Sequence, residues 1–315
     1  MMSEKKVKVL FWGSGSIGSL FGGLLSLLPE LSVTLLGRDP HIETIQRKGL
    51  IIRRRTKKDL LIPAFKGYSI LPKVTEPFDV VFVTCKARDN AESASDLELK
   101  GAIGRNTKLV IVQNGVGNEE YFLHLVPKDH IYRIITTEGA LLLEPGVVMH
   151  SGPGKTSIGK PYADNDEFSD QLGTWLSYVG LDSVATNEIQ MKTWAKLLIN
   201  APINPIATLY HVKNGELITN PDLKKLLEAV VNETVEIFRR RNIPFEDTDP
   251  INSVLNVALA TAGNKCSMLQ DIEKGRRTEI DFLNGRLLQE AHLAGIPAPL
   301  NEELTLKIKK LEAML

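Results

Sequence analysis

The sequence predicts an α/β protein in which a doubly wound, mainly parallel sheet is followed by an all-helical region. Three observations predict this fold. Short apolar runs alternate with helix-like segments in the first half of the 315 residues, strand patterns end near residue 183, and apolar residues then recur every three to four positions. We therefore expect two domains, residues 1–183 and 184–315.

Strand and helix patterns follow one another closely in the first half. Val7–Trp12 is expected to be a strand and Ile17–Leu28 a helix, with a glycine-rich turn between them. The next expected elements are the strands Leu31–Leu36, Asp79–Thr84 and Lys108–Gln113 and the helix His41–Lys48. Between residues 131 and 159, two-residue alternation with Gly and Pro breaks predicts antiparallel strands at the edge of the sheet.

Helical spacing dominates the second half. The expected helices are Ile189–Asn200, Asp222–Arg241, Ile251–Gly263, Glu279–Ala294 and Glu302–Met314. Asn220, Thr278 and Asn301 are candidate N-caps, and Gly295 is a candidate helix stop. Pro202 and Pro205 are expected to distort the end of the first of these helices.

Charge and cysteine content argue against several classes of function. Lys plus Arg and Asp plus Glu both number 38, so no net positive field attracts nucleic acid or an anionic membrane. Cys85 and Cys266 match no metal-binding spacing, and we expect no metal site. No apolar run approaches the roughly 20 residues that cross a bilayer. We expect a soluble, cytoplasmic protein.

A G-x-G-x-x-G pattern, Gly13-Ser14-Gly15-Ser16-Ile17-Gly18, lies between the first expected strand and the first expected helix. In this context the first glycine permits a tight turn, the second lets the backbone approach a pyrophosphate, and the third allows close packing of helix on strand. The helix N-terminus adds N–H groups that can bind the anion. The pattern predicts a Rossmann-like domain that binds a dinucleotide.

The choice between NAD and NADP depends on the end of the second expected strand, where Arg38 and Asp39 follow Gly37. An arginine binds a phosphate with two hydrogen bonds and cannot accept one from a hydroxyl, so Arg38 favours the 2′-phosphate of NADP. Two alternatives stay open: Asp39 could bind the ribose of NAD, or Arg38 could form a surface ion pair.

Three polar residues, Lys196, Asn200 and Asn204, recur at four-residue spacing in an otherwise apolar segment. On a helix they share one face, which could be solvated. Amide side chains among apolar residues and prolines favour instead a buried site that holds a polar ligand.

The chain resembles the ketopantoate reductase (2-dehydropantoate 2-reductase) family over nearly its whole length. The matching motifs stand in the family's order: the loop Gly13–Gly18, Thr84–Ala87, Gln113–Gly117, Thr136–Ala140, Lys196–Pro205, Asn214–Leu217, Ser267–Asp271 and Arg277–Asp281. The family often has His where Glu138 stands, so the charge near the cofactor differs at this position.

The resemblance implies a role for each matched residue. Lys196 is the expected proton donor to the ketone oxygen, and the substrate's hydroxyl and carboxylate are held by Asn200, Asn204, Asn214 and Ser267. Lys86 and Asn114 lie near the nicotinamide ribose and the substrate, Ala140 offers a backbone contact to the cofactor, and Glu279 lies between substrate and cofactor. Taken alone, some of these residues could have a structural role instead. Lys86 could be a strand-end lysine, Asn114 a turn residue, Ser267 a helix N-cap and Glu279 an acid in the first turn of a helix.

The activity that the resemblance implies is reduction of 2-dehydropantoate to pantoate, in pantothenate and coenzyme A biosynthesis, with hydride from NADPH. The expected partner is a small 2-keto acid, with neither nucleic acid nor membrane, and a homodimer is kept open. Two alternatives remain: a related hydroxy-acid or opine-type dehydrogenase, and a non-catalytic NADP-binding regulator.

Overall fold

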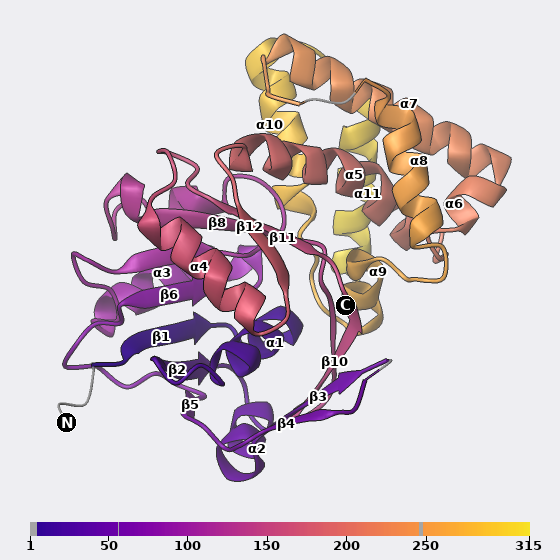
Figure 1. Ribbon diagram of the computed structural model, residues 1–315. Coiled ribbons are helices and arrows are strands. Elements are labelled where there is room, and N and C mark those ends of the chain that lie inside the picture. The colour runs from indigo at the N-terminus through magenta and orange to yellow at the C-terminus, as the bar shows by residue number, and fades with distance from the viewer. Residues whose placement is uncertain (1–4, 56, 246–247) are drawn as a thin grey trace. The chain divides into compact units, whose positions relative to one another are not determined.

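The computed structural model describes residues 5–55, 57–245 and 248–315 (Figure 1). The chain forms two compact units: Met1–Gln113 with Asn118–Ile189, and Asn114–Gly117 with Gln190–Leu315. The mixed α/β first unit and the helical second unit confirm the predicted fold class. The expected domain boundary at residue 183 falls inside strand β12 (Asp182–Ala185), which belongs to the first unit.

The first unit is built on a main sheet that has eight strands in the described part of the chain, in the order β12-β11-β8-β7-β6-β1-β2-β5. The parallel strands are β1 (Val7–Trp12), β2 (Leu31–Leu36), β5 (Gly67–Tyr68), β6 (Val80–Val83), β7 (Lys108–Ile111) and β8 (Ile131–Thr136). Strand β2 lies on one side of β1 and β6 on the other, so the strand order reverses at β1. The carboxyl ends of strands at such a switch point are where doubly wound sheets bind ligands.

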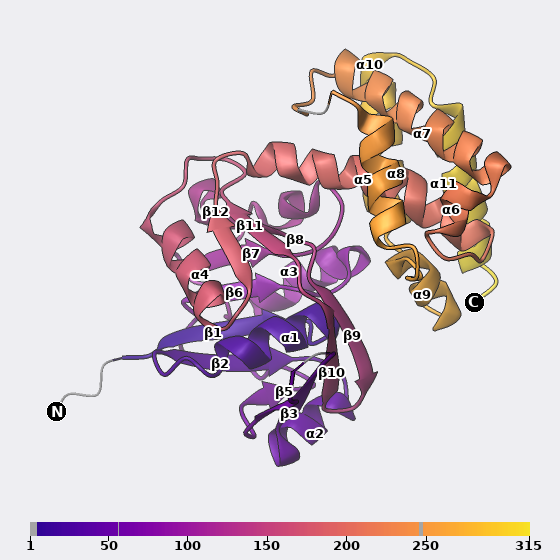
Figure 2. The same cartoon turned by 45° about the vertical axis from the view of Figure 1, so that its right-hand side comes forward.

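Alternate residues of β1 face two different cores. Val9 and Phe11 pack with the helices α1 (Ser16–Leu25) and α4 (Glu167–Tyr178), whereas Leu10 and Trp12 pack with α3 (Asn90–Leu99). The sheet therefore has helices on both faces, as Figures 1 and 2 show. Burial on both faces explains the continuous apolar runs Val9–Trp12 of β1 and Val80–Val83 of β6.

The prediction of antiparallel strands between residues 131 and 159 was only partly right. Strand β11 (Lys155–Gly159) does pair antiparallel with β8, but β12 lies outside it and forms the edge. The hairpin β9 (Gly139–Glu144) and β10 (Val147–Gly152) leaves the main sheet. In the described residues it forms a second, four-stranded sheet with β3 (Leu50–Arg54) and β4 (Leu60–Ile62).

Two glycines of α1 explain how the second sheet packs beside the first. A Cβ on Gly22 would lie 2.5 Å from a methyl of Leu35 in the main sheet, and one on Gly23 would lie 2.5 Å from a methyl of Leu50 in the second sheet. A side chain at either position would require the neighbouring leucine to move. Helix α1 thus packs against both sheets, and the hairpin β9–β10 lies over it (Figure 2).

The second unit is helical throughout its described residues apart from its connections. Its helices are α5 (Ile189–Leu209), α6 (Glu216–Thr219), α7 (Pro221–Arg240), α8 (Pro250–Ala260), α9 (Ser267–Glu273), α10 (Asn284–Ala294) and α11 (Pro299–Glu312), with a 3-10 turn at Ile280–Phe282. Their apolar faces form one core that includes Leu197, Leu227 and Phe238. Among the helices that the structure describes, none combines the length and apolar composition needed to cross a bilayer.

Some expected helix ends were right and others were wrong. Asn220 caps α7 by accepting hydrogen bonds from two backbone N–H groups, and Gly295 ends α10 in the left-handed conformation with φ +66°. Asn301 lies inside α11, which begins earlier at Pro299, and Thr278 precedes the 3-10 turn rather than α10. Pro202 and Pro205 do not end α5, which continues to Leu209.

Candidate functional site

In the first unit, the three glycines of Gly13–Gly18 stand in three different environments. Gly13 has φ +113°, and a Cβ there would lie 2.3 Å from the backbone nitrogen of Cys85. A Cβ on Gly18 would lie 2.1 Å from the carbonyl oxygen of Gly13, so this glycine lets α1 start close to the strand. Gly15 faces open space, since no heavy atom lies within 4 Å of its Cβ position. This environment fits a backbone that another molecule must approach closely.

Neighbouring strands hold the loop through polar side chains. The backbone nitrogen and Oγ of Ser14 both donate to the Leu36 carbonyl, at 2.7 and 2.8 Å. Thr84, just after β6, donates from Oγ1 to the Gly13 carbonyl at 2.7 Å. Ser16 accepts a 3.0 Å hydrogen bond at Oγ from the Leu142 backbone on β9, and Ile17, the second residue of α1, packs against the core. Contacts from β2, from β9 and from the residue that follows β6 therefore fix the loop.

Arg38 and Asp39 are both exposed after β2, but their surroundings differ. Oδ1 of Asp39 accepts a 3.1 Å hydrogen bond from the backbone nitrogen of Glu43 and so supports the first turn of α2 (His41–Lys48). No ion pair of Arg38 occurs among the described residues. The aspartate thus has a structural task in α2.

Lys86 and Ala140 come from two other segments of the first unit. Lys86 stands three residues after β6, on the carboxyl side of the main sheet, and is partly buried. Ala140 lies in β9, opposite His150 of β10. Glu138, where the family often has His, is buried and bonds His150 through Oε2 and Nε2 at 2.5 Å.

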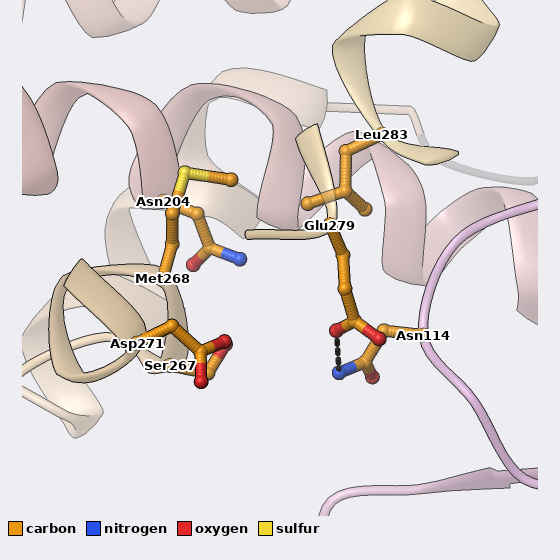
Figure 3. A pocket seen from close by; sticks show the side chains of 7 residues that line it. All are labelled: Asn114, Asn204, Ser267, Met268, Asp271, Glu279 and Leu283. Atoms are coloured by element: carbon orange, nitrogen blue, oxygen red, sulfur yellow. Dashed lines mark hydrogen bonds between the residues drawn. The ribbon is translucent and has the colours of Figure 1, made fainter. Parts of the chain in front are cut away.

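A pocket in the second unit brings together four residues that the sequence singled out: Asn114, Asn204, Ser267 and Glu279 (Figure 3). Nδ2 of Asn114 lies 3.4 Å from Oε2 of Glu279, and Figure 3 shows the two side chains pointing toward each other. The amides and hydroxyl can donate hydrogen bonds to a carboxylate or a hydroxyl, and the carboxyl oxygens of Glu279 can accept one.

A tight contact sets the position of Asn114. The next residue, Gly115, has φ +86°, and a Cβ there would lie 2.4 Å from the carbonyl oxygen of Phe282. The same carbonyl accepts a 3.1 Å hydrogen bond from the backbone of Val116. Glycine at 115 therefore lets the segment Asn114–Gly117 pack directly on the 3-10 turn that follows Glu279.

The pocket also contains three residues that the sequence analysis did not select: Met268, Asp271 and Leu283. Asp271 follows Ser267 by four positions on α9, which places both on one face of the helix. That spacing was a signal which could have identified Asp271. The contributions of Met268 and Leu283 are apolar and carry no comparable signal.

Three other predicted residues do not line this pocket. Lys196 and Asn200 lie on α5, two turns and one turn before Asn204, and both are partly buried. Asn214 is buried and donates from Nδ2 to Oγ1 of Thr261 at 2.9 Å, which ties it to the end of α8. Among the described residues, no group of His, Cys, Asp and Glu side chains could hold a metal ion.

Comparison with known families matches both units. Residues 9–162 match the model of the family described as ketopantoate reductase PanE/ApbA, and residues 188–312 match that of its C-terminal domain. Together the two matches cover nearly the whole chain.

Curated relatives agree over their full length. The chain is 37% identical over 317 residues to the 2-dehydropantoate 2-reductase of Pyrococcus horikoshii, covering 98% of each chain. It is 32% identical over 316 residues to the enzyme of the same name from Archaeoglobus fulgidus, covering 99% of each.

Solved structures share the fold. A PanE/ApbA family ketopantoate reductase from Ralstonia eutropha has a TM-score of 0.88 at 23% identity, with 98% of this chain and 99% of that chain covered. D-mandelate dehydrogenase, solved with NADH and anilino(oxo)acetate, has the same TM-score and coverage at 25% identity. Because family models match both units and curated relatives exceed 30% identity over the full length, the chain belongs to the ketopantoate reductase family and is an oxidoreductase.

Proposed function

We propose that this chain reduces 2-dehydropantoate to pantoate with NADPH, as a step of pantothenate and coenzyme A biosynthesis. One observation carries the proposal. The pocket of the second unit gathers Asn114, Asn204, Ser267 and Glu279 from four separate sequence segments, and all four match positions that bind substrate or cofactor in the family. The names of the relatives, 2-dehydropantoate 2-reductase, supply the substrate.

The first unit, expected as residues 1–183, is proposed to bind the cofactor. The open space at Gly15 and the fixed backbone around it fit a pyrophosphate held by the loop Gly13–Gly18. Arg38 is proposed to bind the 2′-phosphate, because Asp39 is already engaged with the backbone of α2. The remaining cofactor contacts are assigned to Lys86, Asn114, Ala140 and Glu279.

The second unit, expected as residues 184–315, is proposed to bind the keto acid and to supply the proton. Lys196 stabilises the negative charge that develops on the ketone oxygen and then protonates it from Nζ. The carboxylate and hydroxyl of the substrate are oriented by Asn200, Asn204, Asn214 and Ser267. When bound, the cofactor supplies the hydride for the ketone carbon.

The same proposal extends to the cellular setting. Equal numbers of acidic and basic residues and two cysteines without a metal-binding spacing fit a cytoplasmic enzyme that acts on a small 2-keto acid. Analytical ultracentrifugation of the purified protein would show whether it forms a homodimer.

One relative favours a second candidate function, reduction of an aromatic 2-keto acid. The structure of D-mandelate dehydrogenase covers 98% of this chain at 25% identity. The two enzymes share a reaction type, so the substrate alone separates them.

Steady-state oxidation of NADPH tests both candidates. The purified protein is assayed with 2-dehydropantoate, pyruvate, 2-oxoisovalerate and phenylglyoxylate. We expect kcat/KM for 2-dehydropantoate to exceed the others by at least about tenfold, equivalent to roughly 1.4 kcal/mol of discrimination. Preference for phenylglyoxylate would instead support the mandelate-type activity. Cofactor binding without turnover of any acid would support the non-catalytic regulator.

A further inference from the structure

A buried histidine outside the matched motifs is connected to the glycine loop by a chain of hydrogen bonds. His41, the first residue of α2, is buried, and its Nδ1 accepts a 2.9 Å hydrogen bond from the backbone N–H of Gly146. A neutral imidazole that accepts at Nδ1 carries its proton at Nε2. Nε2 lies 2.9 Å from Oγ of Ser19, which donates in turn to the Ser14 carbonyl at 3.1 Å. Every donor in this series of hydrogen bonds therefore has an acceptor.

One end of this series of hydrogen bonds lies in the loop that is proposed to bind the dinucleotide, and the other lies in the hairpin β9–β10. Ser14 is the second residue of the glycine loop, and Gly146 forms the turn between β9 and β10. The same hairpin reaches the loop at a second point, since the Leu142 backbone donates to Oγ of Ser16. The hairpin is thus tied to the loop once directly and once through His41.

We propose that His41 is a positioning residue for the cofactor: through Ser19 it holds the Ser14 carbonyl, and it thereby keeps the loop and the first turn of α1 in the conformation that binds a dinucleotide. This inference rests on the proposed role of Gly13–Gly18 as the cofactor loop. The chain uses the neutral ring, because a protonated His41 would present a second N–H to the Gly146 N–H and break that hydrogen bond.

Burial lowers the pKa of His41 below 6.5, which favours this neutral form. Helix α1 carries no charged residue. The charged groups on the other packed elements are on or just before α2, on β3 and before the hairpin turn: Arg38, Asp39, Glu43, Arg47, Lys48, Arg53, Arg54 and Glu144. All are exposed except Arg54, which is partly buried. Because the folded pKa of this histidine is lowered, the hydrogen bonds from Gly146 to Ser14 are intact above pH 6.5. They are lost as the pH falls through the lowered pKa.

The test compares three variants, each of which removes a different hydrogen bond between Gly146 and Ser14. Ser19→Ala removes the hydroxyl. His41→Asn keeps an acceptor near the position of Nδ1 but cannot reach Ser19, and His41→Gln keeps a donor near the position of Nε2 but loses the bond to Gly146. We expect the first two to weaken NADPH binding roughly three- to tenfold, the size of one hydrogen bond, with kcat at saturating cofactor unchanged. His41→Gln should bind NADPH within about twofold of wild type.

The pH profile adds a readout that lost stability alone does not produce. The KM for NADH should rise in the wild type as the pH falls below 6.5 and stay flat in His41→Asn and His41→Gln. NADH is used here because the 2′-phosphate of NADPH titrates near pH 6 itself. If Ser19→Ala and His41→Asn are folded and bind both cofactors like the wild type, the proposal is overturned.

Gly15→Val separates failure of this inference from failure of the proposed function. The valine side chain would extend into open space, so the variant should fold, but it would obstruct a bound pyrophosphate. Abolished cofactor binding in Gly15→Val, together with unchanged binding in the His41 and Ser19 variants, would refute only the role of His41. Wild-type binding by Gly15→Val would refute the loop as the cofactor site, and this inference with it.

Discussion

Nδ2 of Asn284 donates a 2.9 Å hydrogen bond to the backbone carbonyl of Ala201, the carbonyl that lies four residues before Pro205. In a regular helix this carbonyl would accept from the N–H of residue 205, which proline lacks. Asn284 replaces that donor, and the helix α5 runs through both prolines to Leu209. As a result, Lys196, Asn200 and Asn204 lie on one continuous helix.

This replacement predicts a coupling between two positions 79 residues apart in sequence. Asn284→Leu should lower the free energy of unfolding by about 1–3 kcal/mol, because the Ala201 carbonyl and Oδ1 of Asn301 both lose the donor that Asn284 supplies. Pro205→Ala restores the helical N–H, so the double variant should be more stable than the sum of the single effects by at least about 0.5 kcal/mol. Urea unfolding of the four proteins measures this coupling. Additive effects would show that Asn284 does not compensate for Pro205.

The prolines also mark the limit of what local sequence patterns can predict. Pro202 and Pro205 indicated a distorted helix end because the rule concerns only the chain next to them, whereas the compensating amide comes from α10. The hairpin β9–β10 is a similar case. Its alternation predicted strands, but its pairing with β3 depends on the small side of α1 at Gly23.

Features whose determinants are contiguous were predicted well. The loop Gly13–Gly18 combines its strand, turn and helix start in one segment, and β1, β2 and α2 have the expected bounds. The pocket in the second unit required more, since its residues come from separate segments. Resemblance to a family identified four of them, and nothing in the local pattern around Leu283 could indicate its place there.

Arg38→Ala should shift cofactor preference toward NADH. Loss of a charge-assisted phosphate contact costs roughly 1.5–3 kcal/mol, so the ratio of kcat/KM for NADPH to that for NADH should fall by about ten- to hundredfold. Arg47→Ala is the matched control, because Arg47 is an exposed arginine on α2 that pairs with Glu43. An unchanged ratio in Arg38→Ala would remove Arg38 as the 2′-phosphate ligand and reopen the choice of cofactor.

Protonation of Asp166 should make the first unit less stable in acid. Burial alone would raise the pKa of this carboxyl, but hydrogen bonds from Lys160, Tyr132 and the backbone of Ser169 outweigh it and hold the pKa well below its usual range. A lowered folded pKa means that the stabilisation is present above the unfolded pKa near 4 and is lost as the pH falls.

Asp166 also provides the N-cap of α4, which gives a lower bound for the effect of its removal. Asp166→Ala should cost about 0.5–2 kcal/mol of unfolding free energy at pH 7. The difference from wild type should shrink as the pH approaches about 3, where the wild-type unfolded state is largely protonated. Thermal unfolding at several pH values measures it, and a difference that does not change with pH would contradict the assigned role of the ionised carboxyl.

Lys196→Ala should lower kcat by about 10²–10⁴, the usual contribution of a positioned proton donor, and should leave the KM for NADPH within about twofold. The two effects separate because Lys196 belongs to the second unit, whereas the glycine loop and Arg38 belong to the first. Lys196→Arg keeps the positive charge but has too high a pKa to give up a proton, so it should also be slow. Lys225→Ala, at an exposed lysine of the same unit, controls for the loss of charge. If Lys196→Ala turns over at nearly the wild-type rate, Lys196 is not the proton donor and Glu279 becomes the candidate for that role.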